Sequence, residues 1–567
     1  MLTVRRLYLY AMSGITLAVL GSGLAILLEV LFDQLGLGRA DLLGGFADAD
    51  RQRLSLAAAL VGVALPFWAV HWYLVGRSLR SGAEGAEAER RAPIRALYLA
   101  VVLLVAAFIV ALSMRDLIRA GLRTTSGLQE PYWDVTSGTG ALAAAVIGLL
   151  TWVYHHNVRR ADLVAGPLDG AAAWWPRIYL YGAALVGLLV SAVTIGSLLA
   201  VAIAPALEPG MGHDPGLSPD DARWYEAIDR GSELVAWGGA WALHWLLIAR
   251  AMVSPGWRGV SERASRVRVA FLEAVIVIGA AAVIVFLSEA LGAGIPLALG
   301  ANDALGSSGH IVALAQTIAV ALGSAVPWAV AWWFHHRRLQ REATAEGMAR
   351  GPVSPATATR LHLHGTSLVG LAFGAIGIGW LVGLTVDVAF GGDRTLGDGW
   401  KFEIATYVPV AILGFILWAL TWARLRARRA ADPAAEAAST TRRVALLLVF
   451  GVALVTAIGA LALVLYRTFA TALGVDLPGN PVSELSTPIG ALVTALMVAV
   501  YHGLAVRGDA AIAARTTADG EGRPTDTETA AEVSGILILR GPADADRAAV
   551  LARLRDALPP GFDLDER

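Results

Sequence analysis

Cysteine is absent from the 567 residues, which excludes disulfides, thiolate metal sites and a cysteine nucleophile. Lysine is nearly absent as well, because Lys401 is the only one; a P-loop lysine and a Schiff-base lysine at a cytoplasmic site are therefore excluded. Charged residues make up only 16% of the chain, against about 25% in an ordinary soluble domain. The formal net charge of −1 leaves no basic surplus for binding nucleic acid.

Apolar sequence is what the chain has in abundance, since 56% of its residues are hydrophobic. A helix needs about 20 apolar residues to cross a bilayer. The first apolar run is longer than the ~7–15 residues of a cleavable signal, so we expect it to be retained. The sequence predicts an all-α polytopic membrane protein with about twelve transmembrane helices. The predicted spans are about 7–31, 55–76, 97–114, 139–157, 178–204, 231–251, 268–291, 309–334, 361–390, 403–424, 443–468 and 486–506.

The loops between these segments differ in charge. The segments form six hairpins, and arginine is concentrated in the connections between hairpins, such as 77–95, 335–360 and 424–443. The loops within the hairpins are richer in Asp and Glu, as in 214–229. Because positively charged loops remain in the cytoplasm, we expect a multi-pass protein of the cell membrane with both termini cytoplasmic.

Short aromatic motifs recur at long intervals. Trp68-Ala-Val-His71-Trp72 returns as Trp241-Ala-Leu-His244-Trp245 and as Trp418-Ala-Leu-Thr421-Trp422, 173 and 177 positions apart. Between the copies lie Tyr154-His155-His156, Phe334-His335-His336 and Val500-Tyr501-His502. Hairpins one, three and five open with Arg6-Leu-Tyr8-Leu-Tyr10, Arg177-Ile-Tyr179-Leu-Tyr181 and Arg360-Leu-His362-Leu-His364; the others open near Arg95, Arg266 and Arg443. These intervals predict three parallel four-helix repeats at 1–165, 174–345 and 356–507. The repeats are expected around a pseudo-threefold axis or, alternatively, in a linear order.

These openings and endings, together with the four-helix unit, resemble a family of bacterial multi-pass membrane proteins known as domain of unknown function 5671. The resemblance covers roughly residues 1–507. It implies a multi-pass architecture, and it implies no activity and no functional residues.

The composition changes after Arg507. Residues 508–531 are rich in Thr, Asp and Glu and predict a flexible linker. Residues 532–567 predict a small cytoplasmic β-α-β segment with a strand at 533–539, a helix at 544–558 and a short strand at 562–564. A segment of this size cannot hold a core alone, so we expect it to dock on the membrane part, on a second copy or on another protein.

The histidines lie mostly at one predicted membrane depth, beside the tryptophans. Imidazoles on facing helices can ligate haem or another metal, or relay protons, and no other cofactor is suggested. The simpler interpretation is an interfacial belt in contact with lipid headgroups. Thr421 replaces histidine in the third copy, which argues against a ligand required in all three. The weak candidate ligands are His71, His155, His156, His244, His335, His336 and His502; the interfacial residues are Trp68, Trp72, Trp241, Trp245, Trp418 and Trp422.

Glu273 and three prolines suggest a different function. Glu273 is expected one to two turns into its helix on the cytoplasmic side. A carboxylate near the bilayer centre would mark a functional site, whereas the ordinary interpretation this close to a helix start is an interfacial residue. Pro66, Pro327 and Pro409 fall within spans and are expected to kink them, which exposes carbonyl groups. Together they are a candidate polar pathway; helix packing is the ordinary explanation for the prolines.

No enzyme signature is present, because the sequence lacks His-Glu-x-x-His, Gly-x-Ser-x-Gly and Walker A motifs. The leading hypothesis is therefore a non-enzymatic membrane scaffold or sensor with a docking tail. The alternatives are a transporter or channel with a polar path between the repeats, and a haem- or metal-binding redox protein. Expected partners are membrane lipid and a protein bound through 532–567, with no nucleic acid; nothing in the sequence specifies an oligomeric state.

Overall fold

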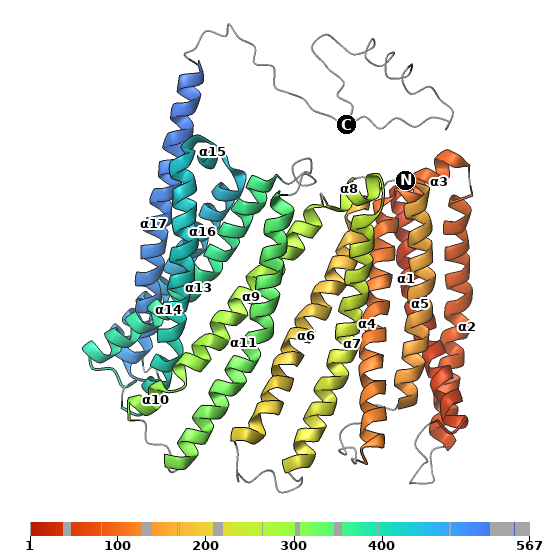
Figure 1. The fold of residues 1–567 in the computed structure, drawn as a ribbon, viewed down its shortest axis with the longest axis horizontal. Helices are drawn as coiled ribbons and strands as arrows, with labels where there is room; N and C mark the ends of the chain where they lie inside the picture. Colours follow the sequence, from red (N-terminus) through yellow and green to blue (C-terminus); the bar gives the residue numbers. More distant parts are fainter. Residues whose placement is uncertain are drawn as a thin grey trace. The chain divides into compact units, whose positions relative to one another are not determined.

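The computed structural model describes residues 2–37, 47–80, 82–127, 138–166, 168, 170–207, 219–263, 265–300, 307–344, 354–394, 396–475, 478–521 and 549. All regular structure in these ranges is helical (Figure 1). The predicted β-α-β segment at 532–567 falls outside them, apart from a single helical residue at 549.

Within the described ranges, twelve helices are long and apolar enough to cross a membrane, the number that the sequence predicts. Many have about 33 residues and are about 50 Å long, well beyond the ~30 Å hydrocarbon core. Each of these helices is thus longer than its apolar run, and its polar ends reach beyond the length of the hydrocarbon core. The spans are α1 (Leu2–Gln34), α2 (Ala47–Ser78), α4 (Pro93–Thr125), α5 (Gly138–Ala165), α6 (Trp175–Leu207), α7 (Pro219–Val253), α9 (Arg266–Gly292), α11 (Ser307–Thr344), α13 (Pro355–Ala389), α14 (Gly399–Ala431), α16 (Thr440–Ala472) and α17 (Pro481–Glu521).

Short helices occupy several connections between the spans. Three of them, α3 (Ala83–Arg90), α8 (Trp257–Arg263) and α15 (Pro433–Ala438), lie at the end of the helices that carries the arginine-rich connections. We call this the arginine end. A fourth, η1 (Gly170–Ala173), connects α5 to α6 at the same end, and α10 (Ile295–Ala298) lies at the opposite end.

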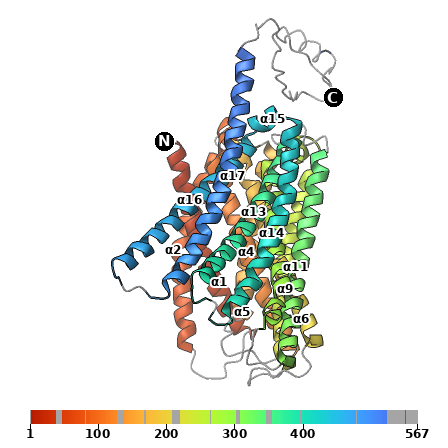
Figure 2. The same ribbon diagram turned by 90° about the vertical axis from the view of Figure 1, so that its left-hand side faces the viewer.

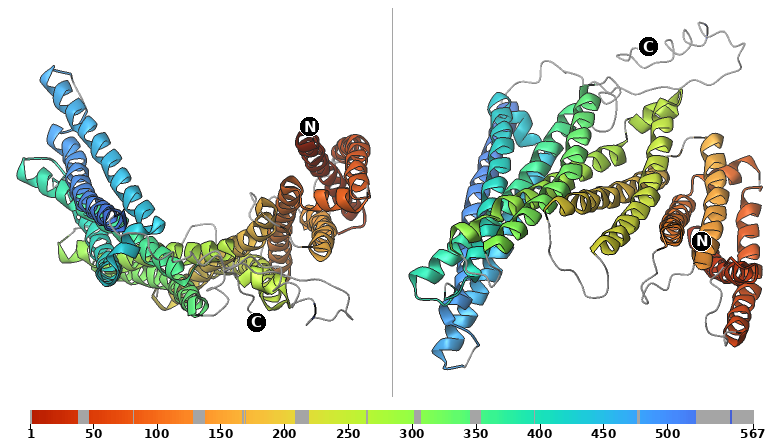
Figure 3. Two further views of the ribbon diagram at one scale, coloured as in Figure 1. Left: turned by 90° about the horizontal axis from the view of Figure 1, so that it is seen from above. Right: turned by 60° about the horizontal axis from the view of Figure 1, so that its bottom comes forward.

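The spans belong to one compact unit, Met1–Ala513, and we describe them in three consecutive groups of four. The first group is α1, α2, α4 and α5; the second is α6, α7, α9 and α11; the third is α13, α14, α16 and α17. Helix α4 packs on α6 and α7, and α9 packs on α13 and α14. The groups therefore follow one another in sequence order (Figure 3), as in the linear alternative. A threefold ring would also require extensive packing of the first group on the third, which is not found among the described residues.

Glycine lets α13 approach two neighbours closely. A Cβ atom added at Gly414 of α14 would lie 2.3 Å from the backbone nitrogen of Gly374. On another face of α13, a Cβ added at Gly490 of α17 would lie 2.1 Å from the carbonyl oxygen of Gly379. Two small-residue faces of α13 are thus used in helix contacts. Helix α16 is inclined to these helices (Figure 2) and exposes apolar side chains such as Val455 and Ile458.

Helix α17 continues through 508–521, where the sequence predicts the start of a flexible linker. Asp509 is buried in this extension and forms ion pairs with Arg442 at 2.6 Å and Arg429 at 2.9 Å. The stretch after Asp509 is rich in alanine, which has the highest helix propensity. Charge pairing and propensity together extend the helix beyond its apolar run. The remaining linker residues, 522–531, lie outside the described ranges.

Candidate functional site

A buried cluster of charged groups joins four helices of the first group at the arginine end. Arg95 of α4 is 1% exposed and donates to Asp162 of α5 over 2.7 and 3.2 Å and to the Tyr10 hydroxyl over 3.1 Å. Glu89 of α3 accepts hydrogen bonds from Tyr10 at 2.7 Å and Arg6 at 2.9 Å. Each arginine thus has a carboxylate partner, and Tyr10 links the two ion pairs.

The second group contains a cluster of the same design. Arg268 of α9 is 1% exposed and donates to Glu342 of α11 over 2.7 Å and to the Tyr181 hydroxyl over 3.2 Å. Glu262 of α8 accepts from Tyr181 at 2.8 Å and from Arg177 at 2.9 Å. The tyrosine again connects an arginine of one helix pair to a carboxylate on the short connecting helix.

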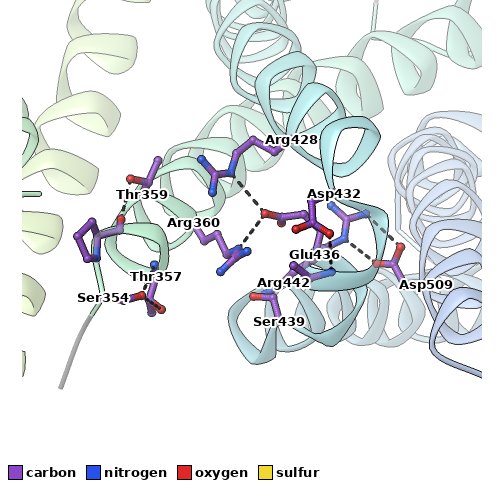
Figure 4. A network of polar contacts seen from close by, with 12 residues as sticks. Ser354, Thr357, Thr359, Arg360, Arg428, Asp432, Glu436, Ser439, Arg442 and Asp509 are labelled. Carbon is purple, nitrogen blue, oxygen red and sulfur yellow. Dashed lines mark hydrogen bonds and ion pairs between the residues drawn. The ribbon is translucent and has the colours of Figure 1, made fainter. Parts of the chain in front are cut away.

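In the third group the ion pairs remain and the tyrosine is replaced. Figure 4 shows Arg360 next to Glu436 of α15, at 2.9 Å, and Arg442 next to Asp509. His364 stands four residues after Arg360, where the other groups have tyrosine, and it is 4% exposed. We call these three assemblies the polar clusters. Because the buried arginine of each cluster is paired with a carboxylate, we interpret the polar clusters as structural locks at the helix ends.

Three carboxylates, one in each polar cluster, follow a spacing that sequence reasoning missed. Each pairs with the buried arginine of its group and lies seven positions after a buried histidine. The paired arginines are Arg95, Arg268 and Arg442. Arg95 is the predicted hairpin opening, whereas Arg268 and Arg442 lie two residues after Arg266 and one residue before Arg443, which the sequence predicts instead. The pairs are His155 with Asp162, His335 with Glu342 and His502 with Asp509.

Five of the candidate histidines lie inside the protein, between helices. In each, Nδ1 lies 2.7–3.0 Å from the carbonyl oxygen four residues earlier in the same helix. Because a carbonyl can only accept, Nδ1 is assigned as the protonated nitrogen and Nε2 is the acceptor. The five are His71, His155, His244, His335 and His502.

In three of these histidines, Nε2 forms a hydrogen bond with a tyrosine hydroxyl. Tyr98 donates to His155 over 3.2 Å, and Tyr179 donates to His244 over 2.9 Å. The third contact joins the Tyr8 hydroxyl to His71 over 3.3 Å.

A haem or metal ligand needs a free nitrogen lone pair, so these three side chains do not fit that role. No group of three or more His, Asp or Glu side chains in the described ranges is arranged to hold a metal ion. The lipid-facing belt is also incorrect for the five buried rings, because helix packing encloses them.

The repeated tryptophans connect the second and fourth helices of each group. Trp72 donates to the Tyr154 hydroxyl over 2.5 Å, and Trp422 donates to that of Tyr501 over 2.6 Å. Trp245 packs on the ring of Phe334, which has no hydroxyl, at a centroid distance of 6.4 Å. One turn earlier, Trp68 and Trp418 stack on Trp72 and Trp422, and Trp241 holds the same position in α7.

Glu273 lies at the junction of the second and third groups. This carboxylate is 6% exposed, and one of its oxygens lies 3.5 Å from Nδ1 of His362 on α13. The ring of His336 on α11 is 4.6 Å from that of His362 between centroids. Neither Glu273 oxygen has a hydrogen-bond partner in the described part of the chain. We call Glu273, His336 and His362 the junction cluster. It is the one place where the structure brings together members of the two predicted sets, the histidines and the pathway residues.

The junction cluster departs from the pattern shared by the three groups. The position five residues after the buried arginine is Ala100 in the first group, Glu273 in the second and Leu447 in the third. His362 takes the place of Tyr8 and Tyr179 in the repeated openings. The other two groups thus have no acidic residue at the position of Glu273, and two groups have tyrosine at the position of His362. The exchange of Tyr for His in the opening was the available signal for His362, which sequence reasoning left out of the candidate ligands.

The prolines of the predicted pathway do not converge on Glu273. Pro66, Pro327 and Pro409 lie inside α2, α11 and α14, and each helix continues past its proline. A pocket of about 620 Å³ at the arginine end is lined by neither Glu273 nor these prolines. The prolines are accounted for as parts of separate helices.

Comparison with known proteins gives one family. The model described as Domain of unknown function (DUF5671) matches residues 6–138 and 360–497. These segments begin at Arg6 and Arg360, which open the first and third groups. No curated protein and no solved structure matches the chain.

Proposed function

We propose that this protein, which belongs to the family DUF5671 through residues 6–138 and 360–497, is a non-enzymatic integral membrane sensor that responds to protonation of its junction cluster. The supporting observation is the contact between Glu273 and His362, two ionisable side chains buried on neighbouring helix groups. An ionisable group inside a membrane segment is a functional site by default because burying its charge is costly. Because Glu273 is on α9 and His362 is on α13, an unbalanced charge on the pair would destabilise the packing of these two helices.

The pair is neutral overall only when it holds a single ionisable proton. Removal of that proton leaves a buried carboxylate without compensation, and addition of another leaves a buried imidazolium. Either state weakens the junction, because an uncompensated buried charge is strongly unfavourable. The rings of His336 and His362 are tilted by 43° with centroids 4.6 Å apart, and Arg424 of α14 is a charged neighbour of His336. The junction is therefore expected to be most stable at intermediate pH.

The chain supplies its own control variants for this proposal. Glu273→Ala restores the residue of the first group, and His362→Tyr restores that of the first and second groups. In lipid nanodiscs we expect the wild-type protein to lose about 1–3 kcal/mol of stability on each side of an intermediate-pH maximum. The double variant should have a flatter profile. Thermal unfolding between pH 5 and 9 measures both; equal profiles would refute the sensor.

A proton-coupled transporter is the second candidate, because the same buried carboxylate suits an ion pathway. It requires a polar route through the membrane next to Glu273. Proton uptake by proteoliposomes that disappears in Glu273→Ala would favour this function over the sensor. If wild-type proteoliposomes take up protons no faster than those with the Glu273→Ala variant, a proton-coupled transporter is excluded.

The sensor needs an output, and we assign it to docking of residues 532–567 on a partner protein. The extension of α17 changes how this is tested, since deletion of 508–567 would also remove Asp509 from Arg442. Deletion of 522–567 should abolish partner binding without changing the melting temperature of the membrane part. Deletion of 508–567 should lower that temperature as well. Unchanged partner binding in both deletions, measured by co-purification, would contradict the assignment.

The proposal also includes three parallel repeats at 1–165, 174–345 and 356–507, with both termini in the cytoplasm. Support for the repeats comes from the three polar clusters and from one family model that matches two segments. Support for the orientation comes from the arginine-rich connections at the arginine end.

A further inference from the structure

The pocket of about 620 Å³ lies at the junction of the first and second groups, at the arginine end. Its volume is within the range of about 300–1,000 Å³ that is usual for small-molecule sites. Four arginines line it, namely Arg159, Arg160, Arg177 and Arg266. Glu262 is the only acidic residue among the lining side chains. Glu262 is already engaged by Arg177 and Tyr181, so the pocket has a surplus of positive charge.

Arg159 is the buried member of this set. The residue is only 8% exposed, and its guanidinium packs 5.6 Å from the ring centroid of Tyr179. Its Nε is buried without a hydrogen-bond partner, and no carboxylate in the described ranges forms an ion pair with it. All three buried arginines of the polar clusters, in contrast, are paired with carboxylates. Glu262 attracts Arg159 electrostatically but forms no ion pair with it. A buried cation without a paired carboxylate is costly, and a bound anion would reduce that cost.

The fold does not require a cation at this position. The position four residues after His155, His335 or His502 is Arg159 in the first group, Leu339 in the second and Val506 in the third. Leu339 is 3% exposed, so an apolar side chain fills the corresponding place in the second group. Helix packing does without a cation at this position in the other two groups, so Arg159 is available to a ligand.

We propose that this pocket binds the phosphate headgroup of an anionic phospholipid. The phosphate would accept hydrogen bonds from Arg159 and from the exposed Arg160 and Arg266, which stand at helix ends where headgroups lie. Leu163, Leu180 and Leu247 also line the pocket and offer an apolar surface to the start of an acyl chain. Basic pockets between transmembrane helices at the cytoplasmic side are typical of such lipid recognition.

The test compares wild-type protein with Arg159→Leu, which copies Leu339, and with Arg337→Leu as a control. Arg337 is an exposed arginine of α11, two positions after a buried histidine and outside the pocket. Each full-length protein is purified in neutral detergent and titrated with phosphatidylglycerol, phosphatidylcholine or glycerol phosphate. Bound lipid is counted by native mass spectrometry, and the melting temperature is recorded.

The wild-type and Arg337→Leu proteins should bind phosphatidylglycerol and melt at a higher temperature with it. Arg159→Leu should bind it at least tenfold more weakly, yet melt at or above the wild-type temperature without lipid. Equal lipid affinity of Arg159→Leu and wild type would overturn the site. Glycerol phosphate binding as tightly as the lipid would overturn its assignment to a lipid, and equal binding of phosphatidylcholine would overturn the selectivity for anionic headgroups.

Discussion

Replacement of Asp162 by leucine is expected to destabilise the protein by about 3–5 kcal/mol, the typical result of removing one partner of a buried ion pair. Asp162 and Arg95 are almost fully enclosed, with exposed side-chain fractions of 8% and 2%. Without Asp162, the Arg95 guanidinium keeps only the Tyr10 hydroxyl, which cannot neutralise it. Unfolding of the purified variant in nanodiscs measures the loss.

Two further variants separate charge burial from general damage. The double substitution Arg95→Leu with Asp162→Leu should recover most of the loss, because an apolar pair often replaces a buried ion pair without penalty. Glu87→Ala breaks the exposed pair with Arg91 and should cost at most about 1 kcal/mol. If Asp162→Leu were no worse than Glu87→Ala, the polar clusters would not be structural locks.

Gly414→Val is the second substitution expected to have a large effect, at about 3 kcal/mol or more, or loss of folded protein. A Cβ at this position would meet the backbone nitrogen of Gly374 at 2.3 Å and the carbonyl oxygen of Gly370 at 2.9 Å. Backbone atoms of a packed helix cannot move aside as a flexible side chain can, so α13 and α14 must separate.

Gly459→Val is the matched control, because a Cβ at Gly459 of α16 has nothing within 4 Å. It introduces the same side chain into a membrane helix and should leave the melting temperature near that of the wild-type protein. Size-exclusion chromatography and thermal unfolding of both variants test this. A Gly414→Val protein that folds and melts like the Gly459→Val protein would contradict the close approach of α13 and α14.

The spans were predictable because the bilayer fixes their length and composition locally. A run such as 97–114 indicates a helix by itself, whatever its neighbours. Helix ends were less predictable, since α4 extends to Thr125 and α17 to Glu521 on polar residues. Those extensions depend on charge pairing between distant segments, as between Asp509 and Arg442.

The positions of the histidines and the ion pairs could not be predicted in the same way. Arg6 meets Glu89 across 83 residues, on a short helix that no apolar run marks. His155 and His156 are adjacent in sequence, but the first is 1% exposed and the second is only partly buried. Membrane depth follows from local sequence, whereas burial depends on which face of a helix meets its neighbour. The motif intervals predict which positions correspond, and under that correspondence Glu273, His362 and Arg159 differ from the residues of the other groups.

The absence of cysteine permits the most direct measurement of the junction. Cysteines introduced by Val330→Cys on α11 and Leu361→Cys on α13, both at exposed positions, would carry the only spin labels in the protein. Pulsed electron paramagnetic resonance then reports the distance between the second and third groups in nanodiscs as pH is varied. We predict a narrow distance distribution at intermediate pH that broadens at both extremes when Glu273 and His362 are present. In the Glu273→Ala, His362→Tyr background the distribution should not change with pH. The same pH response in both backgrounds would contradict a sensor built on the junction cluster.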